Sequence, residues 1–133
     1  MNNIFEFESR VYYCDTDAGG VVYHSRYLDF CEKARTELLR SRGIIQMELL
    51  EKHNIGFVVN YCNLCYRKPA RLDDLLLIST EVKEMTGASF KMTQKVFLKE
   101  SNDLLVEVEV GIVCVNDKFK LTRIPNHIRE TLA

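Results

Sequence analysis

The segment from residue 13 to residue 30 brings together groups that could hydrolyse an ester or a thioester. Asp17 offers a carboxylate, the glycine pair at 19–20 permits left-handed or close backbone conformations, and a helix is expected to begin near His24. The first N–H groups of a helix have no partner inside it, and the helix dipole adds positive charge there. A carboxylate beside such a helix end predicts acyl transfer to water, in which Asp17 attacks the carbonyl or deprotonates a water molecule.

A thioester fits this set of groups better than an amide does. A thiol has a pKa of about 8.5, so a thiolate leaves without much help from a general acid. The chain has no G-x-S-x-G segment, and its three histidines, His24, His53 and His127, lack the context of a catalytic triad. The sequence therefore predicts hydrolysis driven by a carboxylate.

Several of these residues also have a purely structural interpretation. Asp beside Gly commonly makes an Asx-turn, and for Asp15 we favour that role because a second carboxylate close to Asp17 would repel it. The backbone N–H of His24 is a better catalytic candidate than its imidazole. Glu32 and Arg35 lie three apart on the expected helix, which favours an ion pair, although Glu32 could instead face the cleft as an auxiliary carboxylate.

Length and composition restrict the class of protein. The 133 residues fit one domain, with 47% hydrophobic and 28% charged residues. The net charge of −1 argues against a general nucleic-acid or membrane-surface binder. No apolar run approaches the roughly 18 residues of a membrane span, and the start MNNIFEFESR does not look like a signal peptide, so we expect a cytoplasmic protein.

The five cysteines fit a reducing compartment. Cys62 and Cys65 have C-x-x-C spacing, but they fall in a predicted strand, where a separation of three places the two sulfurs on opposite faces. No second pair of such residues completes a tetrahedral metal site. We therefore expect buried structural thiols, and neither a metal nor a redox function for this pair.

Hydrophobic periodicity predicts an α+β domain. Apolar residues recur every three or four positions over 25–42, which predicts a long amphipathic helix that stops at Gly43. A shorter helical stretch is expected at 44–53. The other segments read as strands separated by short turns, at 4–13, 57–68, 75–85, 89–98 and 105–116. The last four strands should pair as an antiparallel meander, giving a curved five- or six-stranded sheet around one central helix.

The segment DTDAGGVVYHSRYLDFCEKAR (15–35) closely resembles the signature of the 4-hydroxybenzoyl-CoA thioesterase group of hotdog-fold proteins. It is most similar to the acyl-CoA thioesterases found with the Tol–Pal envelope system of Gram-negative bacteria (the YbgC type). In that subset R-V-Y-Y-x-D-T-D-A-G-G-V-V-Y-H precedes Y-x-x-F-x-E-x-A-R-T-E, and these runs stand here at 10–24 and 27–37. The stretches FVV, PARLDD and VCV also look similar, so the resemblance covers nearly the whole chain.

The resemblance implies a hotdog fold and hydrolysis of an acyl-CoA without a cofactor. The family's catalytic carboxylate maps onto Asp17, and the helix-start amide that polarises the thioester carbonyl maps onto His24. Subunits of the family pair sheet edge to sheet edge with the active sites at the interface, so we expect a homodimer or a homotetramer. The residues that we expect to contact the substrate are Gly20, Val21, Val22, Tyr23 and Tyr27 in the motif, with Arg67 and Ser89 as candidates, beside Lys68 and Arg71, for binding the CoA phosphates.

Two other functions stay open at this level. The protein could bind acyl-CoA or acyl carrier protein without turnover, although the intact Asp17 and Gly20 speak against a purely binding role. It could also be a hotdog enoyl-thioester hydratase, but those enzymes pair an acidic residue with a catalytic histidine in a different motif. The less familiar stretch NYCNLCY (60–66) leaves the acyl preference open.

Overall fold

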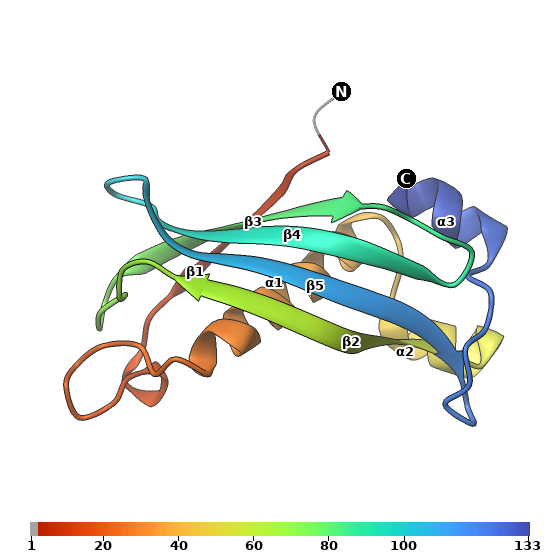
Figure 1. Ribbon diagram of the computed structural model, residues 1–133, viewed down its shortest axis with the longest axis horizontal. Coiled ribbons are helices and arrows are strands. Elements are labelled where there is room, and N and C mark those ends of the chain that lie inside the picture. Colours follow the sequence, from red (N-terminus) through yellow and green to blue (C-terminus); the bar gives the residue numbers. More distant parts are fainter. Residues whose placement is uncertain (1–2) are drawn as a thin grey trace.

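A single antiparallel sheet forms the body of the protein, for which a computed structural model describes residues 3–133. Its strands alternate between half-buried or exposed and buried positions over much of their length, as expected for a sheet with one face on the core. The spatial order of the strands is β1-β3-β4-β5-β2 (Figure 1). Their bounds are β1 Phe5–Arg10, β2 Ile55–Tyr66, β3 Leu75–Lys83, β4 Ser89–Leu98 and β5 Asp103–Asn116.

The expected meander of four strands is wrong for β2. Only β3, β4 and β5 follow one another as neighbours, whereas β2 pairs with β5 at one edge and β1 pairs with β3 at the other. The cause is the segment 67–74 between β2 and β3. Its backbone bonds to the loop after β1, through Val22 N–H to Ala70 O and Val11 N–H to Asp74 O, so it crosses the end of the sheet instead of making a hairpin.

The long helix α1 spans Arg26–Ser41, close to the predicted bounds. Gly43 follows it with a φ of 78°, a left-handed conformation that glycine adopts without strain. The buried stripe of α1 faces the sheet, and the helix packs against β1 and β3 (Figure 1). This stripe consists of Tyr27, Phe30, Cys31, Ala34, Leu38 and Leu39.

Three shorter elements differ from the expectation in detail. The predicted helical stretch at 44–53 is a short helix α2, Gln46–Glu48, continued by a π-helical turn over Leu49–His53. The first strand ends at Arg10, not at Tyr13, because Tyr13–Asp15 forms a 3₁₀ turn. A C-terminal helix α3, Asn126–Leu132, was not predicted; it follows Pro125 and buries only Ile128 and Leu132, too short a pattern to show a helical period.

The core between α1 and the sheet is almost entirely hydrophobic. Thr80 and Gln94 are the two buried polar residues among those described. Gln94 donates hydrogen bonds to the Cys31 carbonyl and to Thr80 Oγ1, both at 2.9 Å, so its amide group is paired inside the core. A buried polar group without such partners would be costly, and this pairing fixes the Gln94 side chain.

Replacing Leu38 by Ala tests the packing of α1 on the sheet. Leu38 is 0% exposed, so we expect the Leu38→Ala variant to lose about 2–5 kcal/mol of unfolding free energy. Urea unfolding followed by circular dichroism measures this change. Leu50→Ala is the control, since Leu50 is exposed and its truncation should stay within about 0.5 kcal/mol. Equal losses in the two variants would contradict the placement of Leu38 in the core.

Candidate active site

Asp17 lies at the tip of a tight loop that its own backbone and side chain shape. Its N–H donates to Val21 O at 3.0 Å, and the Gly20 N–H donates to Asp17 O at 3.1 Å. The Gly19 N–H donates to Asp17 Oδ1 at 2.9 Å, which is an Asx-turn. Gly20 has a φ of 77°, as the glycine pair suggested. The turn uses one carboxylate oxygen, and no described residue donates to Asp17 Oδ2, which faces solvent in the single chain.

Two β-bridges hold the same loop in place. Thr16 forms a β-bridge with Val22, and Val21 forms one with Arg71. Asp15 accepts a hydrogen bond from the Tyr12 N–H at 2.9 Å, which agrees with the turn-forming role that we favoured for it. The Tyr23 N–H donates to Asp15 O at 2.9 Å. The loop is therefore held rigidly at the foot of α1.

Within the described residues, the start of α1 leaves backbone amides without an acceptor, that of His24 among them. The Arg26 N–H donates to Tyr23 O at 2.8 Å, but in the part of the chain that the structure describes no group accepts from the His24 N–H. The Tyr66 hydroxyl donates to His24 O at 3.0 Å and so holds this residue in place. The imidazole of His24 is exposed and lies beside the Tyr23 ring, with centroids 4.5 Å apart. The free amide at a helix start is the geometry that stabilises an oxyanion.

A groove of about 290 Å³ opens beside this amide. It brings together five of the residues predicted to contact the substrate, and also Tyr66, from the stretch 60–66 for which the sequence left the acyl preference open. The residues that line it are Val22, His24, Tyr27, Tyr66, Arg67, Lys68 and Pro69. Asp17, Gly20, Val21 and Tyr23 stand in the adjoining loop and do not line the groove in the single chain.

Two tyrosine rings form one wall of the groove, and a buried hydrogen bond holds one of them in place. Tyr27 and Tyr66 meet edge to face with ring centroids 5.7 Å apart. The buried Tyr27 hydroxyl accepts a hydrogen bond from the Ala70 N–H at 3.0 Å, and burial raises the pKa of Tyr27. The phenol therefore stays neutral and serves as a fixed wall. Tyr66 could have been suspected only as an aromatic residue at the end of a strand.

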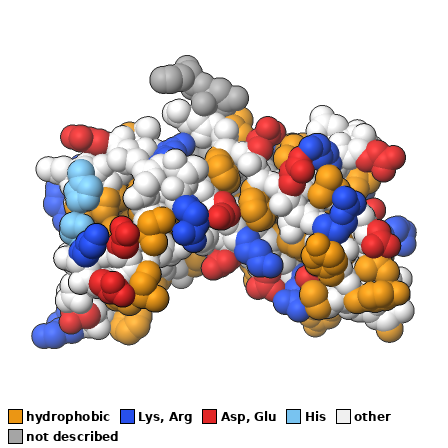
Figure 2. Space-filling model, turned by 180° about the vertical axis from the view of Figure 1, so that it is seen from behind, with side chains coloured by type: hydrophobic (Ala, Val, Ile, Leu, Met, Phe, Trp, Pro, Cys, Tyr) orange, Lys and Arg blue, Asp and Glu red, His pale blue; other side chains and the backbone are white. Residues whose placement is uncertain are grey.

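Basic groups lie at the rim of the groove, already paired with acids. Arg67 forms an ion pair with Glu107, which lowers the pKa of that carboxyl, and Lys68 Nζ lies 3.5 Å from Asp103 Oδ2. Both cations are exposed, although their acids are half-buried; ion pairs at the surface contribute little, so a stronger anion can compete for the cations. Seen from the side of α1, basic and acidic side chains are interspersed and no single basic face appears (Figure 2).

Ser89 does not reach the groove within one chain. It begins β4 opposite Val113, whereas the Arg67 N–H bonds to Leu105 O, eight residues away along β5. Eight residues of strand span about 26 Å. The Ser89 hydroxyl lies instead 2.6 Å from Thr86 Oγ1 in the turn before β4.

The expected ion pair between Glu32 and Arg35 is wrong. No oxygen of Glu32 lies within 4.0 Å of the guanidinium, and Arg35 Nη1 donates to Gln94 Oε1 at 3.0 Å. The reason is that Gln94, fixed in the core, offers an acceptor on the side of α1 that faces the sheet. Glu32 is exposed and borders a second hollow, but it does not line the groove at His24, where the alternative interpretation would place an auxiliary carboxylate.

Burial of the cysteines is only partly as expected. Cys31 and Cys114 are buried, and burial raises the pKa of the Cys31 thiol to about 12. Cys65 is exposed and Cys62 half-buried, so the expectation of buried thiols is wrong for Cys65; β2 is an edge strand and is covered on fewer sides. Within residues 3–133, no three His, Cys, Asp or Glu side chains are grouped so as to hold a metal ion. None of the helices there is long and apolar enough to cross a membrane.

Known proteins similar to this chain are thioesterases. The model of the thioesterase-like superfamily matches residues 11–132. The acyl-CoA thioesterase YbgC of Haemophilus influenzae is 44% identical over 130 residues, which cover 97% of this chain and 94% of that protein. A probable thioesterase from Bartonella henselae has a TM-score of 0.87 at 38% identity, covering 92% of this chain and 99% of that one.

A further solved structure supports the fold alone. It is a 4-hydroxybenzoyl CoA thioesterase mutant in complex with 4-hydroxybenzoyl CoA, with a TM-score of 0.91 at 19% identity, and it covers 99% of this chain and 100% of that one. The five-stranded antiparallel sheet around one long helix is the expected α+β hotdog fold. The chain therefore belongs to the thioesterase-like superfamily of hotdog proteins, in the group that contains the YbgC thioesterases.

Proposed function

We propose that the protein hydrolyses an acyl-CoA thioester to the free acid and CoA, with Asp17 and the His24 amide as its catalytic groups. The observation that carries the proposal is the junction of loop and helix: an Asx-turn holds Asp17 with one free oxygen, and the chain then leads directly to an unpaired amide beside a groove. The names of the two similar proteins described above, an acyl-CoA thioesterase and a probable thioesterase, support the same activity.

The two groups have complementary roles. The thioester oxygen accepts a hydrogen bond from the His24 N–H, which stabilises the negative charge that develops as the carbonyl is attacked. Asp17 either attacks the carbonyl carbon itself or removes a proton from an attacking water molecule. The carbon–sulfur bond then breaks, and CoA leaves as a thiolate and takes up a proton. Where Asp17 itself attacked, water next cleaves the acyl–Asp17 anhydride, which releases the free acid and restores the carboxylate; where Asp17 acted as a base, the attacking water already supplies the oxygen of the acid. No metal or redox cofactor is needed.

The remaining predicted residues fit around this centre. Val22 and Tyr27 form walls of the groove. The adjoining loop is shaped by Gly20, Val21 and Tyr23. The cations at the rim, Arg67 and Lys68, suit the phosphates of CoA. The carrier could equally be acyl carrier protein, which presents the same pantetheine thioester. The exposure of Asp17 in one chain favours a homodimer or homotetramer in which a second copy closes the site and Ser89 of that copy approaches it.

The unpaired edge of β2 is the surface on which such pairing would occur, because an open edge strand offers free backbone donors and acceptors. The similarity to the YbgC type favours a cytoplasmic protein that serves the Tol–Pal envelope system.

An Asp17→Asn variant tests the catalytic carboxylate. Asn keeps an oxygen that can accept from the Gly19 N–H, so the loop should hold its shape while the charge is lost. We expect the rate of thiol release from a panel of short, long and aromatic acyl-CoAs to fall at least about a hundredfold. Asp15→Asn is the matched control, since Asp15 accepts a hydrogen bond from Tyr12 and should be replaceable with little loss.

Three results would contradict the proposal. Wild-type protein that binds acyl-CoA without releasing thiol would be a binding module. Loss of enoyl absorbance from an enoyl-CoA without thiol release would indicate a hydratase. A folded Asp17→Asn variant as active as the wild type would limit Asp17 to its turn.

The rim cations predict a specific effect on substrate binding. In an Arg67→Gln, Lys68→Gln double variant, we expect the KM for acyl-CoA to rise because the CoA phosphates lose their cationic partners, while kcat is retained. The rise should be only about five- to tenfold, measured at low salt, because exposed charge contacts are weak and are screened by salt. Steady-state kinetics with acyl-pantetheine, which lacks the nucleotide phosphates, provides the control. An equal rise of KM for acyl-pantetheine would contradict phosphate binding at this rim.

A further inference from the structure

The boundary between α1 and β2, called the seam below, runs along one side of the helix. The helix packs against β1 and β3, and two hollows open on its other side. One is the groove at His24, and the other is a cleft of about 140 Å³ bordered by Arg35. Tyr27, Cys31 and Arg35 follow one another at intervals of four, so they lie on one face of the helix. Tyr27 lines the groove, Arg35 lines the cleft, and the buried Cys31 lies between them. From His24 to Arg35 the helix rises about 16 Å.

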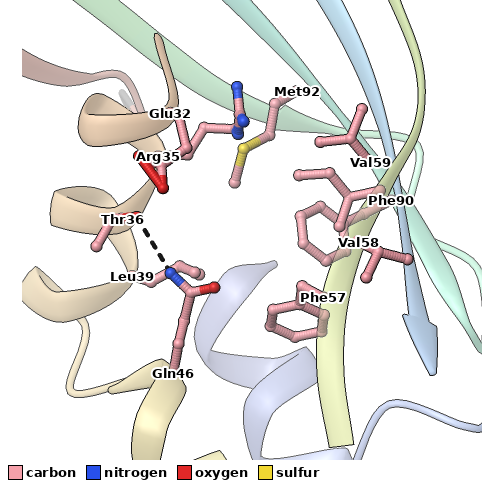
Figure 3. A pocket seen from close by; sticks show the side chains of 11 residues that line it. Glu32, Arg35, Thr36, Leu39, Gln46, Phe57, Val58, Val59, Phe90 and Met92 are labelled. Atoms are coloured by element: carbon pink, nitrogen blue, oxygen red, sulfur yellow. Dashed lines mark hydrogen bonds between the residues drawn. The ribbon is translucent and has the colours of Figure 1, made fainter. Parts of the chain in front are cut away.

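The cleft has two walls of different chemistry. Figure 3 shows polar side chains on the helical side, including Glu32, Arg35 and Thr36, and hydrophobic side chains from the strands facing them. The hydrophobic wall includes Phe57, Val58, Phe90 and Met92. Gln46 of α2 donates to Thr36 Oγ1 at 3.1 Å and closes one side. Such a space suits methylene groups along the strands and one polar group at the helix.

The Arg35 guanidinium is fixed, half-buried and without a carboxylate partner. Gln94, itself held by Cys31 O and Thr80 Oγ1, accepts from Arg35 Nη1 at 3.0 Å. Among residues 3–133 no carboxylate oxygen lies within 4.0 Å of Arg35. Burial lowers the pKa of Arg35, yet a guanidinium stays charged in proteins and carries five N–H donors. Most of these donors have no acceptor in the chain.

A charge in this position discriminates between acyl groups. A methyl end pushed against the guanidinium would remove water from it and offer no hydrogen bond in return. A carboxylate end would form a charge-assisted, two-pronged pair with it. Glu32 on the same wall interacts electrostatically with Arg35 and would repel that carboxylate, but Glu32 is exposed, so solvent weakens this repulsion.

We propose that the acyl group lies along this seam with its far end at Arg35, and that the enzyme prefers acyl-CoAs whose medium-length chain ends in a carboxylate. This proposal rests on the thioesterase function proposed above and names the substrate class of that site. Arg35 is then a residue that determines specificity and takes no part in the bond-breaking step. Gln94 is a positioning residue, because it orients the guanidinium.

The test compares substrates of equal length that differ only at the far end. Sebacoyl-CoA and dodecanedioyl-CoA are paired with decanoyl-CoA and lauroyl-CoA, and kcat/KM is measured from thiol release. We expect wild-type protein to favour the carboxylate-ended member of a pair about ten- to hundredfold, the range of a hydrogen bond to a charged group. Arg35→Met should abolish or reverse this preference. Arg40→Met, on the exposed face of the same helix, should keep it.

Butyryl-CoA, which is too short to reach Arg35, serves as the control for folding and catalysis. The wild type, Arg35→Met and Arg40→Met should hydrolyse butyryl-CoA at similar rates. If Arg35→Met does not fold, Arg35→Gln replaces it, since the Gln side chain can still donate to Gln94. Glu32→Gln should increase the preference for the carboxylate-ended member, because it removes a negative charge from the wall.

Two outcomes overturn the inference and leave the thioesterase function intact. One is a wild-type preference for the methyl-ended member of every pair. The other is an Arg35→Met variant that keeps the wild-type preference. If that variant also no longer self-associates in analytical ultracentrifugation, a second copy supplies the partner of Arg35. Absence of thiol release from every substrate, butyryl-CoA included, would instead overturn the proposed function, and the inference with it.

Discussion

The position of the candidate active site depends on a small set of backbone hydrogen bonds around Ala70. The Val22 N–H donates to Ala70 O, and the Ala70 N–H donates to the Tyr27 hydroxyl. The first bond ties the Asp17 loop to the segment after β2, and the second ties that segment to α1. Ala70 is fully buried, so both bonds are sheltered from competing water. The loop carboxylate and the helix amide are therefore held relative to each other by one buried junction.

The start and the middle of α1 present different polar groups along one seam. Its start offers an amide with no partner in the chain, and three turns further on its core-facing side offers a guanidinium with most of its donors free. Free N–H groups are usual at a helix start, whereas the half-buried Arg35 departs from the more complete pairing that such polar groups normally reach in a folded chain. Departures of this kind mark the places where a ligand completes the structure.

The sequence predicted the elements better than their arrangement, and the catalytic roles of Asp17 and His24 stay predictions. The period of apolar residues located α1 and four strands within a few residues, because local patterning determines which face of each element is buried. The place of β2 beside β5 depends on hydrogen bonds between residues 11–22 and 67–74, which are distant in the chain and leave no periodic signal. The partner of Arg35 was missed for the same reason, since Gln94 lies on another element.

The central claim is that the thioester carbonyl binds at the His24 amide with Asp17 beside it. The most direct measurement is a crystal structure of the protein with a non-hydrolysable acyl-CoA analogue in which a methylene group replaces the thioester sulfur. We predict the carbonyl oxygen about 3 Å from His24 N and an Asp17 carboxylate oxygen, or a water molecule bound to it, in line with the carbonyl carbon. A carbonyl bound away from the start of α1, with the His24 amide still unpaired, would contradict the account.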